Sequence, residues 1–94
     1  MPRTQTDIRT WLDDEGVEAE GMLLADGYED AFIGIASAGP DGKYVAVYDI
    51  PECLRILQER DGMTAQAADE YFSFNTLGAH VEPQTPLYLH RMEK

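Results

Sequence analysis

The sequence has few basic residues. Seven lysines and arginines stand against 18 aspartates and glutamates, so the formal net charge of the 94-residue chain is −11. The interval between Arg9 and Lys43 contains no lysine or arginine. A surface of this kind repels the phosphates of nucleic acids and anionic lipids, and it attracts basic protein surfaces. The shortage of bases therefore argues against direct binding to nucleic acid or to a membrane.

Cysteine and long apolar runs are also scarce. Cys53 is the only cysteine, so a disulfide within the chain is excluded and a reducing cytoplasm is the expected location. No apolar window approaches the roughly 20 residues that a membrane helix needs. The first residues lack the apolar core of a signal peptide. A chain of this length is expected to fold as a single domain over residues 1–94.

The usual patterns of an enzyme or a metal site are missing as well. There is no glycine-rich phosphate loop, and His80 and His90 have no partners at zinc-binding spacing. Cys53 and one of these histidines could serve as nucleophile and base. However, Cys53 falls on the predicted inner face of a helix, where a cysteine behaves as a small apolar residue. We therefore expect a protein that is not an enzyme and that holds no cofactor and no metal.

Capping residues and apolar spacing predict three helices. The first begins after Thr4 or Thr6 and ends at Gly16. The second begins at Pro51, a residue that suits the first turn of a helix, and the third begins at Thr64. The predicted inner faces are Ile8, Trp11 and Leu12 in the first helix, Cys53, Leu54 and Leu57 in the second, and Ala68, Tyr71, Phe72 and Asn75 in the third.

Three short runs predict strands. Residues 31–38 and 44–50 are apolar or β-branched and flank the turn 39–42, which indicates a hairpin with Val45 and Val47 buried on one side. The run 86–90 alternates leucines with other residues and predicts a last strand. The expected fold is α+β, with the hairpin 31–50 and the strand 86–90 in one small antiparallel sheet packed with about three helices. The strand order is left open.

The acidic residues between Arg9 and Lys43 form the candidate partner-binding surface. Its members are Asp13, Asp14, Glu15, Glu18, Glu20, Asp26, Glu29 and Asp30. The first three lie at the C-terminal end of a predicted helix, where the helix dipole disfavours negative charge. We therefore expect the helix to fray there, or a cation or a partner to neutralise the acids. The alternative is that the acidity only keeps the chain soluble.

A second candidate site combines a loop with polar residues near the C-terminus. The loop Asp26–Asp30 supplies three carboxylates within five residues, which could hold calcium although the spacing is not that of an EF-hand. Asn75 and Thr85 are each placed to bond backbone groups of the adjoining loops. A small ligand-binding or metal-binding module, or a minor enzyme, that uses the Asp26–Asp30 loop with Asn75 is therefore the alternative function.

Four runs resemble a known family. They are ADGYEDAFIGI at 25–35, AVYDI at 46–50, ERDGMTAQAADEYFSFNTLGAHV at 59–81 and QTPLYL at 84–89. Together they are similar to a family of small uncharacterised proteins of bacterial viruses and prokaryotes, in which FNxxGA followed by TP is a fairly specific phrase. This chain has Glu82-Pro83 where the family usually has Gly-Glu. The resemblance implies no activity; it implies a viral or mobile-element setting, in which short acidic proteins often block host machinery.

These observations favour a small, acidic, non-enzymatic phage-type protein that binds and inhibits a host nucleic-acid-processing protein. It would act as anti-CRISPR proteins and other DNA mimics do, in the host cytoplasm, as a monomer or a homodimer. The expected partner is a protein with a basic surface, while direct contacts with nucleic acid or membrane are not expected. If the acids are not the interface, the apolar rim of the sheet is, with Tyr44, Tyr48 and Tyr88 as its likeliest anchors.

Overall fold

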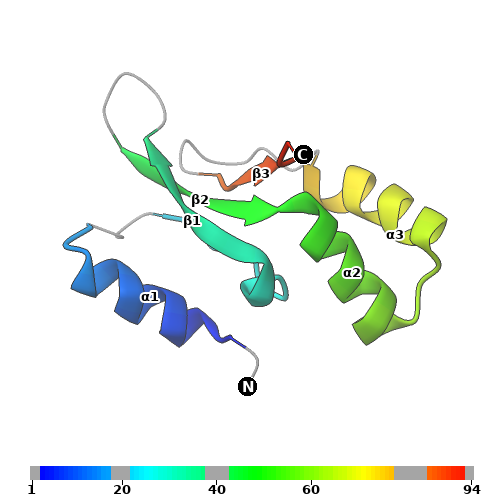
Figure 1. Ribbon diagram of the computed structural model, residues 1–94, viewed down its shortest axis with the longest axis horizontal. Coiled ribbons are helices and arrows are strands. Elements are labelled where there is room, and N and C mark those ends of the chain that lie inside the picture. Colours follow the sequence, from blue (N-terminus) through cyan, green and yellow to red (C-terminus); the bar gives the residue numbers. More distant parts are fainter. Residues whose placement is uncertain (1–2, 18–21, 38–42, 78–84, 93–94) are drawn as a thin grey trace.

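The computed structural model describes residues 3–17, 22–37, 43–77 and 85–92, and within these ranges the chain has the predicted α+β architecture (Figure 1). The predicted turn 39–42, His80, Glu18, Glu20 and the loop 82–84 lie outside the described residues. In chain order the elements are α1 (Gln5–Asp14), the 3-10 turn η1 (Glu29–Ala31), β1 (Phe32–Ser37), β2 (Tyr44–Asp49), α2 (Ile50–Asp61), α3 (Ala65–Phe72), the π-helical turn η2 (Ser73–Leu77) and β3 (Leu87–Leu89).

The three strands form one mixed sheet in the order β1-β2-β3. β1 and β2 are the antiparallel arms of the predicted hairpin, whereas β3 runs parallel to β2, with Val47 opposite Leu87 and Tyr48 opposite Tyr88. The prediction that strand 86–90 joins an antiparallel sheet is therefore wrong. The reason is the connection. The chain leaves the sheet at the end of β2, passes through α2 and α3, and comes back so that β3 runs in the same direction beside the second half of β2, as is usual for a helical crossover.

β1 contains a bulge at Ile33. Phe32 pairs with Tyr48 and Gly34 pairs with Val47, so Ile33 is one extra residue on the β1 side. Gly34 has a φ of 153°, a backbone conformation that residues with a side chain rarely adopt. The bulge interrupts the alternation of the strand: Phe32 and Ile35 face the buried cluster, whereas the two residues between them, Ile33 and Gly34, lie on the other face.

The helix starts are confirmed at all three predicted positions. The Thr4 hydroxyl accepts a hydrogen bond from the backbone of Asp7, and the Asp7 carboxylate accepts one from the backbone of Thr4, which is a complete capping box. Asp49 caps α2 just before Pro51, and Thr64 caps α3. Because these signals depend on residues within one helical turn, the sequence alone is sufficient to read them.

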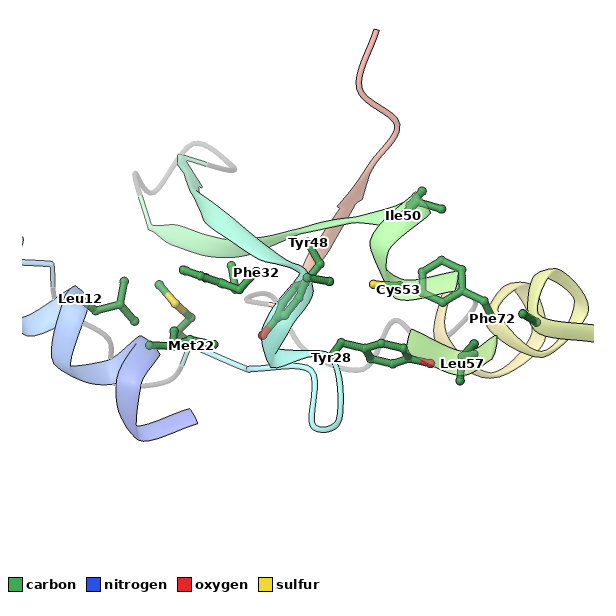
Figure 2. Close-up of a cluster of buried hydrophobic side chains, with 13 residues drawn as sticks. Leu12, Met22, Tyr28, Phe32, Tyr48, Ile50, Cys53, Leu57 and Phe72 are labelled. Carbon is green, nitrogen blue, oxygen red and sulfur yellow. The ribbon is translucent and has the colours of Figure 1, made fainter. Parts of the chain in front are cut away.

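The buried cluster joins the two ends of the molecule. Its members are Ile8, Leu12, Met22, Tyr28, Ala31, Phe32, Ala46, Tyr48, Ile50, Cys53, Leu57, Ala68 and Phe72. Figure 2 shows residues of α1 on one side and residues of α2 and α3 on the other, with Phe32 and Tyr48 between them. The Tyr48 side chain is fully buried and its hydroxyl accepts a hydrogen bond of 2.9 Å from the backbone of Ala25. Burial raises the pKa of Tyr48 to about 12.

A row of aromatic rings crosses this cluster from α1 to the region of α3. Neighbouring rings have their centroids 5.2 to 5.9 Å apart, mostly in edge-to-face contact, which is a favourable geometry for aromatic pairs. The row consists of Trp11, Phe32, Tyr48, Tyr88, Phe72 and Tyr28, in that order. It draws its members from two helices, three strands and one loop, so it ties the otherwise separate ends together.

Three residues predicted for inner helix faces lie at the surface instead. Trp11 on α1 and Tyr71 on α3 are each exposed, as is Asn75 in η2. Both aromatic residues directly precede a fully buried one, Leu12 and Phe72 respectively. Successive side chains on a helix point about 100° apart, so short helices beside a small sheet bury a narrow stripe and leave its neighbours at the edge.

Candidate protein-binding surface

The acids at the C-terminal end of α1 are exposed. Asp13, Asp14 and Glu15 form no ion pair with any base in the described part of the chain. The helix nevertheless extends to Asp14, and Gly16 follows with a φ of 73°. The predicted fraying is therefore not seen, and three negative charges remain at the negative end of the helix dipole.

The acids of the loop are held by three different donors. Asp30 accepts a hydrogen bond of 2.6 Å from the backbone of Arg3, and Asp26 accepts one of 3.4 Å from the Gln5 side chain. The Glu29 carboxylate accepts a bond of 2.8 Å from the backbone of Gly27. The bonds from Arg3 and Gln5 connect the loop to the start of α1, and the bond from Gly27 lies within the loop. Among the described residues no group of histidine, cysteine or acidic side chains is arranged to hold a metal.

The predicted acidic surface is therefore divided into two parts. Asp26 and Asp30 lie at the N-terminal end of α1, where Gln5 and Arg3 contact them, and Asp13 to Glu15 lie at the opposite end. A helix of ten residues is about 15 Å long, which sets the separation of the two groups. Only the group at the C-terminal end of α1 lacks internal partners among the described residues.

An exposed apolar surface borders α1 and crosses the sheet. Its large members are Trp11, Ile33, Leu87 and Leu89, which are 41 to 44% exposed, together with the half-buried Val47. Two shallow hollows of about 300 and 470 Å³ follow this surface, the first between α1 and β1 and the second on the open face of the sheet. Both include Ile33 and Gly34, so the surface is continuous, and we call these five residues the apolar strip.

The apolar rim predicted from the sequence is present, but with other anchors. Tyr48 is fully buried and Tyr88 packs against the buried cluster, so only Tyr44 of the three predicted tyrosines is exposed. The alternation in β3 places Leu87 and Leu89 on the face opposite to Tyr88. That alternation was visible in the sequence, whereas the bulge, which keeps both Ile33 and Gly34 on the open face, was not.

A third hollow, of about 300 Å³, brings together the residues of the alternative site. Its polar lining consists of Asp26, Tyr28, Asn75, Thr76 and Thr85. The hydroxyls of Tyr28 and Thr76 lie 3.4 Å apart. The Asn75 amide donates to the backbone carbonyl of Tyr71, in the preceding helical turn, at 3.1 Å. The following loop that the sequence predicts it to bond, residues 78–84, lies outside the described residues.

The candidate nucleophile is unsuited to catalysis. Cys53 is fully buried against the core, and burial together with the nearby Asp49 raises the pKa of its thiol to about 12. A thiol of that kind is not ionised at neutral pH, and the thiolate is the reactive form. His90 is exposed, and no hydrogen bond or ion pair in the described part of the chain links it to Cys53.

Comparisons of the chain with protein-family models, with curated proteins and with solved structures found no match. The resemblance of the four sequence runs to a family of phage and prokaryotic proteins therefore stays a prediction. In the described ranges, no helix has the length and apolar character required to cross a membrane. The described residues form a small α+β fold that has an acidic helix end without a basic partner among them, and an exposed apolar strip.

Proposed function

We propose that this chain is a non-enzymatic inhibitor that binds a basic, nucleic-acid-binding surface of a host protein. The observation that carries this proposal is the acidic C-terminal end of α1. Asp13, Asp14 and Glu15 have no basic partner in the described ranges, and each unfavourable charge at a helix end costs about 0.3–1 kcal/mol. A basic partner surface would neutralise these acids and relieve that cost.

The use of the basic residues elsewhere supports the same conclusion. Arg55 and Arg60 pair with acids of α2, and Arg91 pairs with Asp49. The Arg3 guanidinium donates to the backbone carbonyl of Phe32 at 2.6 Å. Four arginines are thus committed to internal contacts, and none of them reaches the end of α1.

Nucleic-acid-binding proteins are the class of partner that such a surface fits best. Their binding faces are rich in lysine and arginine, and they are adapted to bind closely spaced negative charges. The two acidic groups at the ends of α1, about 15 Å apart, offer negative charge at two places along one side of the molecule. The resemblance to phage proteins supports the cytoplasm of an infected cell as the setting of this activity.

Charge reversal at the end of α1 tests this function. The variant Asp13→Lys/Asp14→Lys is compared with Asp69→Lys/Glu70→Lys, which changes the net charge equally on the exposed surface of α3. Each protein is immobilised, exposed to a bacterial lysate and eluted with salt or with duplex DNA. We expect the wild type and the α3 variant, but not the α1 variant, to capture a nucleic-acid-processing protein that both eluents release. If salt does not release the captured protein, and if the α1 variant still captures it, the proposal is excluded.

A second function, binding of a small ligand, is favoured by the third hollow. Asp26 and Asn75 are far apart in the sequence but line the same hollow, beside the Tyr28 hydroxyl and the Tyr88 ring. A carboxylate, an amide and a hydroxyl next to an aromatic ring suit a small amine with a flat apolar part. Native mass spectrometry of the purified protein tests this. A bound small molecule that is lost in Asn75→Asp would support it, and a protein free of ligand would speak against it.

A further inference from the structure

The apolar strip has the composition of an interface and not of an ordinary surface. Isolated exposed apolar residues are common, but contiguous patches of them on soluble proteins mark interaction sites. Trp11, Ile33, Leu87 and Leu89 come from three different elements and line two hollows that share Ile33 and Gly34. The strip is therefore a single surface assembled by the fold.

The fold leaves this face open for a specific reason. Tyr48 pairs with Phe32 on β1 and with Tyr88 on β3, and these side chains point to the buried cluster. The residues paired at Val47, which are Gly34 and Leu87, point to the other face. Helices α1, α2 and α3 contribute to the cluster on the first face, and no described element covers Leu87 or Leu89 on the second.

The length of the strip suggests what fits it. Neighbouring strands lie about 4.8 Å apart, so β1 to β3 measures about 10 Å, and the neighbouring helix α1 adds about 10 Å more. A helix of about 13 residues spans this distance of about 20 Å. Amphipathic helices that place apolar side chains in a shallow groove are a common mode of recognition.

The charge at the border of the strip determines which sign of charge the partner should carry. Asp7 lines the first hollow together with Arg3, whose guanidinium donates to the backbone carbonyl of Phe32. Asp14 follows Trp11 by three positions on α1, so Asp7 and Asp14 both lie on the side of the helix that carries Trp11 and outnumber the one base there. At the other end, Arg91 is neutralised by Asp49 at 3.0 Å. A basic partner therefore suits this border better than a second copy of this chain, whose net charge is −11.

We propose that the apolar strip is the centre of the interface and receives an amphipathic helix of the partner whose apolar face is flanked by lysine or arginine. This inference rests on the proposed function for the charge of the partner. The apolar side chains of that helix would lie over Ile33, Leu87 and Leu89, beside Trp11, and its basic residues would lie near Asp7 and Asp14. The acids then guide the encounter, and the strip holds the bound partner.

The test uses two synthetic peptides of leucine and lysine, each about 13 residues long. Both have the same composition, but only one has its leucines at helical spacing. We expect the patterned peptide to bind at least about tenfold more tightly, because the difference of about 1.4 kcal/mol corresponds to a modest apolar contact. Its binding should shift the backbone amide NMR signals of Ile33, Leu87 and Leu89. Equal binding of the two peptides would overturn the inference.

A matched pair of variants locates the binding site. Leu87→Thr/Leu89→Thr removes apolar surface from the strip while keeping residues that favour a strand. Phe74→Ser/Met92→Ser removes a larger exposed apolar surface elsewhere, where the side chains are 87% and 98% exposed, so it is a stringent control. The first variant should lose the preference for the patterned peptide, and the second should keep it. The amide NMR spectrum of each free variant verifies its fold, and Ile33→Thr serves as a replacement if the first variant unfolds.

The outcomes separate this inference from the proposed function. If both variants prefer the patterned peptide equally, or if the wild type dimerises in sedimentation equilibrium and Leu87→Thr/Leu89→Thr does not, the inference is wrong. In that case salt-sensitive capture of a nucleic-acid-processing protein would still stand. If the peptide preference holds but the Asp13→Lys/Asp14→Lys variant captures the same proteins as the wild type, the strip is an interface and the proposed function fails alone.

Discussion

The two longer helices, α1 and α2, use their acidic residues in opposite ways. On α2, Arg55 lies between Glu52 and Glu59, with an Nη1–Oε2 distance of 2.6 Å to the latter, and Arg60 pairs with Asp61 at 3.0 Å. The acids of α1 beyond the capping Asp7 have no such partners in the described residues. The acids of α2 therefore stabilise the helix that carries them, and those of α1 are available to another molecule.

The ends of the two helices show the same difference. α2 ends with Arg60 in its last turn and Gly62 in the left-handed conformation, with a φ of 70°. Both features suit the negative end of a helix. α1 has no base in its last turn and ends instead with Asp13, Asp14 and Glu15. The charges at the C-terminal end therefore stabilise α2 and destabilise α1, although both helices pack on the same core.

The largest expected effect tests whether both helices belong to one cooperative unit. Leu12 on α1 and Leu57 on α2 are both fully buried. Each substitution, Leu12→Ala and Leu57→Ala, should lower the free energy of unfolding by about 2–5 kcal/mol, because it removes apolar contacts and leaves a cavity. Chemical denaturation measures both. A small loss for Leu12→Ala alone would mean that α1 is attached loosely and that its acids belong to a mobile arm.

The N-cap residues of the two helices, Thr4 and Asp49, should contribute to stability by amounts that differ less strongly. Asp49 is buried and accepts bonds from the backbone of Glu52 and from Arg91, at 3.1 and 3.0 Å. Asp49→Ala should therefore cost more than the roughly 1 kcal/mol expected for Thr4→Ala. Asp49→Asn is the control, since it keeps the cap and removes the charge that faces Arg91. Equal losses from Asp49→Ala and Thr4→Ala in thermal denaturation would show that the contact with Arg91 contributes little.

Charge reversal should change the free energy of unfolding in opposite directions on the two helices. Asp14→Lys should raise the free energy of unfolding by about 0.3–1 kcal/mol, because it places a cation at the negative end of α1. Glu52→Lys should lower it by a similar amount, since it removes the pair with Arg55 and places a cation at the positive end of α2. Both effects should shrink in high salt. The same sign for both variants would contradict the comparison.

The smallest expected effect concerns pH. The guanidinium groups of Arg55 and Arg60 lower the pKa of Glu52 and of Asp61, respectively. A carboxyl with a lowered pKa in the folded state contributes stability above its ordinary pKa of about 4, and that contribution is lost as the pH falls through the lowered value. Arg55→Gln should return the pKa of Glu52 to its ordinary range and leave that of Asp61 unchanged, as read by carboxyl NMR titration. No change in Glu52 would refute the pairing.

Local features of the fold could be predicted from the sequence. The caps at Thr4, Asp49 and Thr64 and the hairpin depend on residues close to one another in the chain, so single residue types identify them. The burial of Val45 was predicted for the same reason. Val47 is only half-buried because its neighbours on the open face are Gly34 and Leu87. A charge at Val47 should therefore be tolerated better than one at Val45.

Features that depend on distant parts of the chain could not be predicted. The parallel direction of β3 follows from where α2 and α3 return the chain, which no local pattern records. The division of the acidic surface follows from the bonds of Arg3 and Gln5 to the loop at 26–30. The burial of Tyr48 and the exposure of Tyr44 arise because the cluster covers only one part of β2. Of the candidate site, the sequence identified the acids and an apolar rim of the sheet, but not the residues that form the strip.

The position of Trp11 gives this protein a built-in optical reporter. Trp11 is the only tryptophan of the chain, its ring meets Phe32 edge-on at 5.8 Å, and it lies at the border of the apolar strip. Because its indole is 41% exposed, water surrounds part of the ring in the free protein. A molecule that settles on the strip would displace this water and shift the fluorescence to shorter wavelengths. Occupancy of this surface can therefore be followed in real time without attaching a dye.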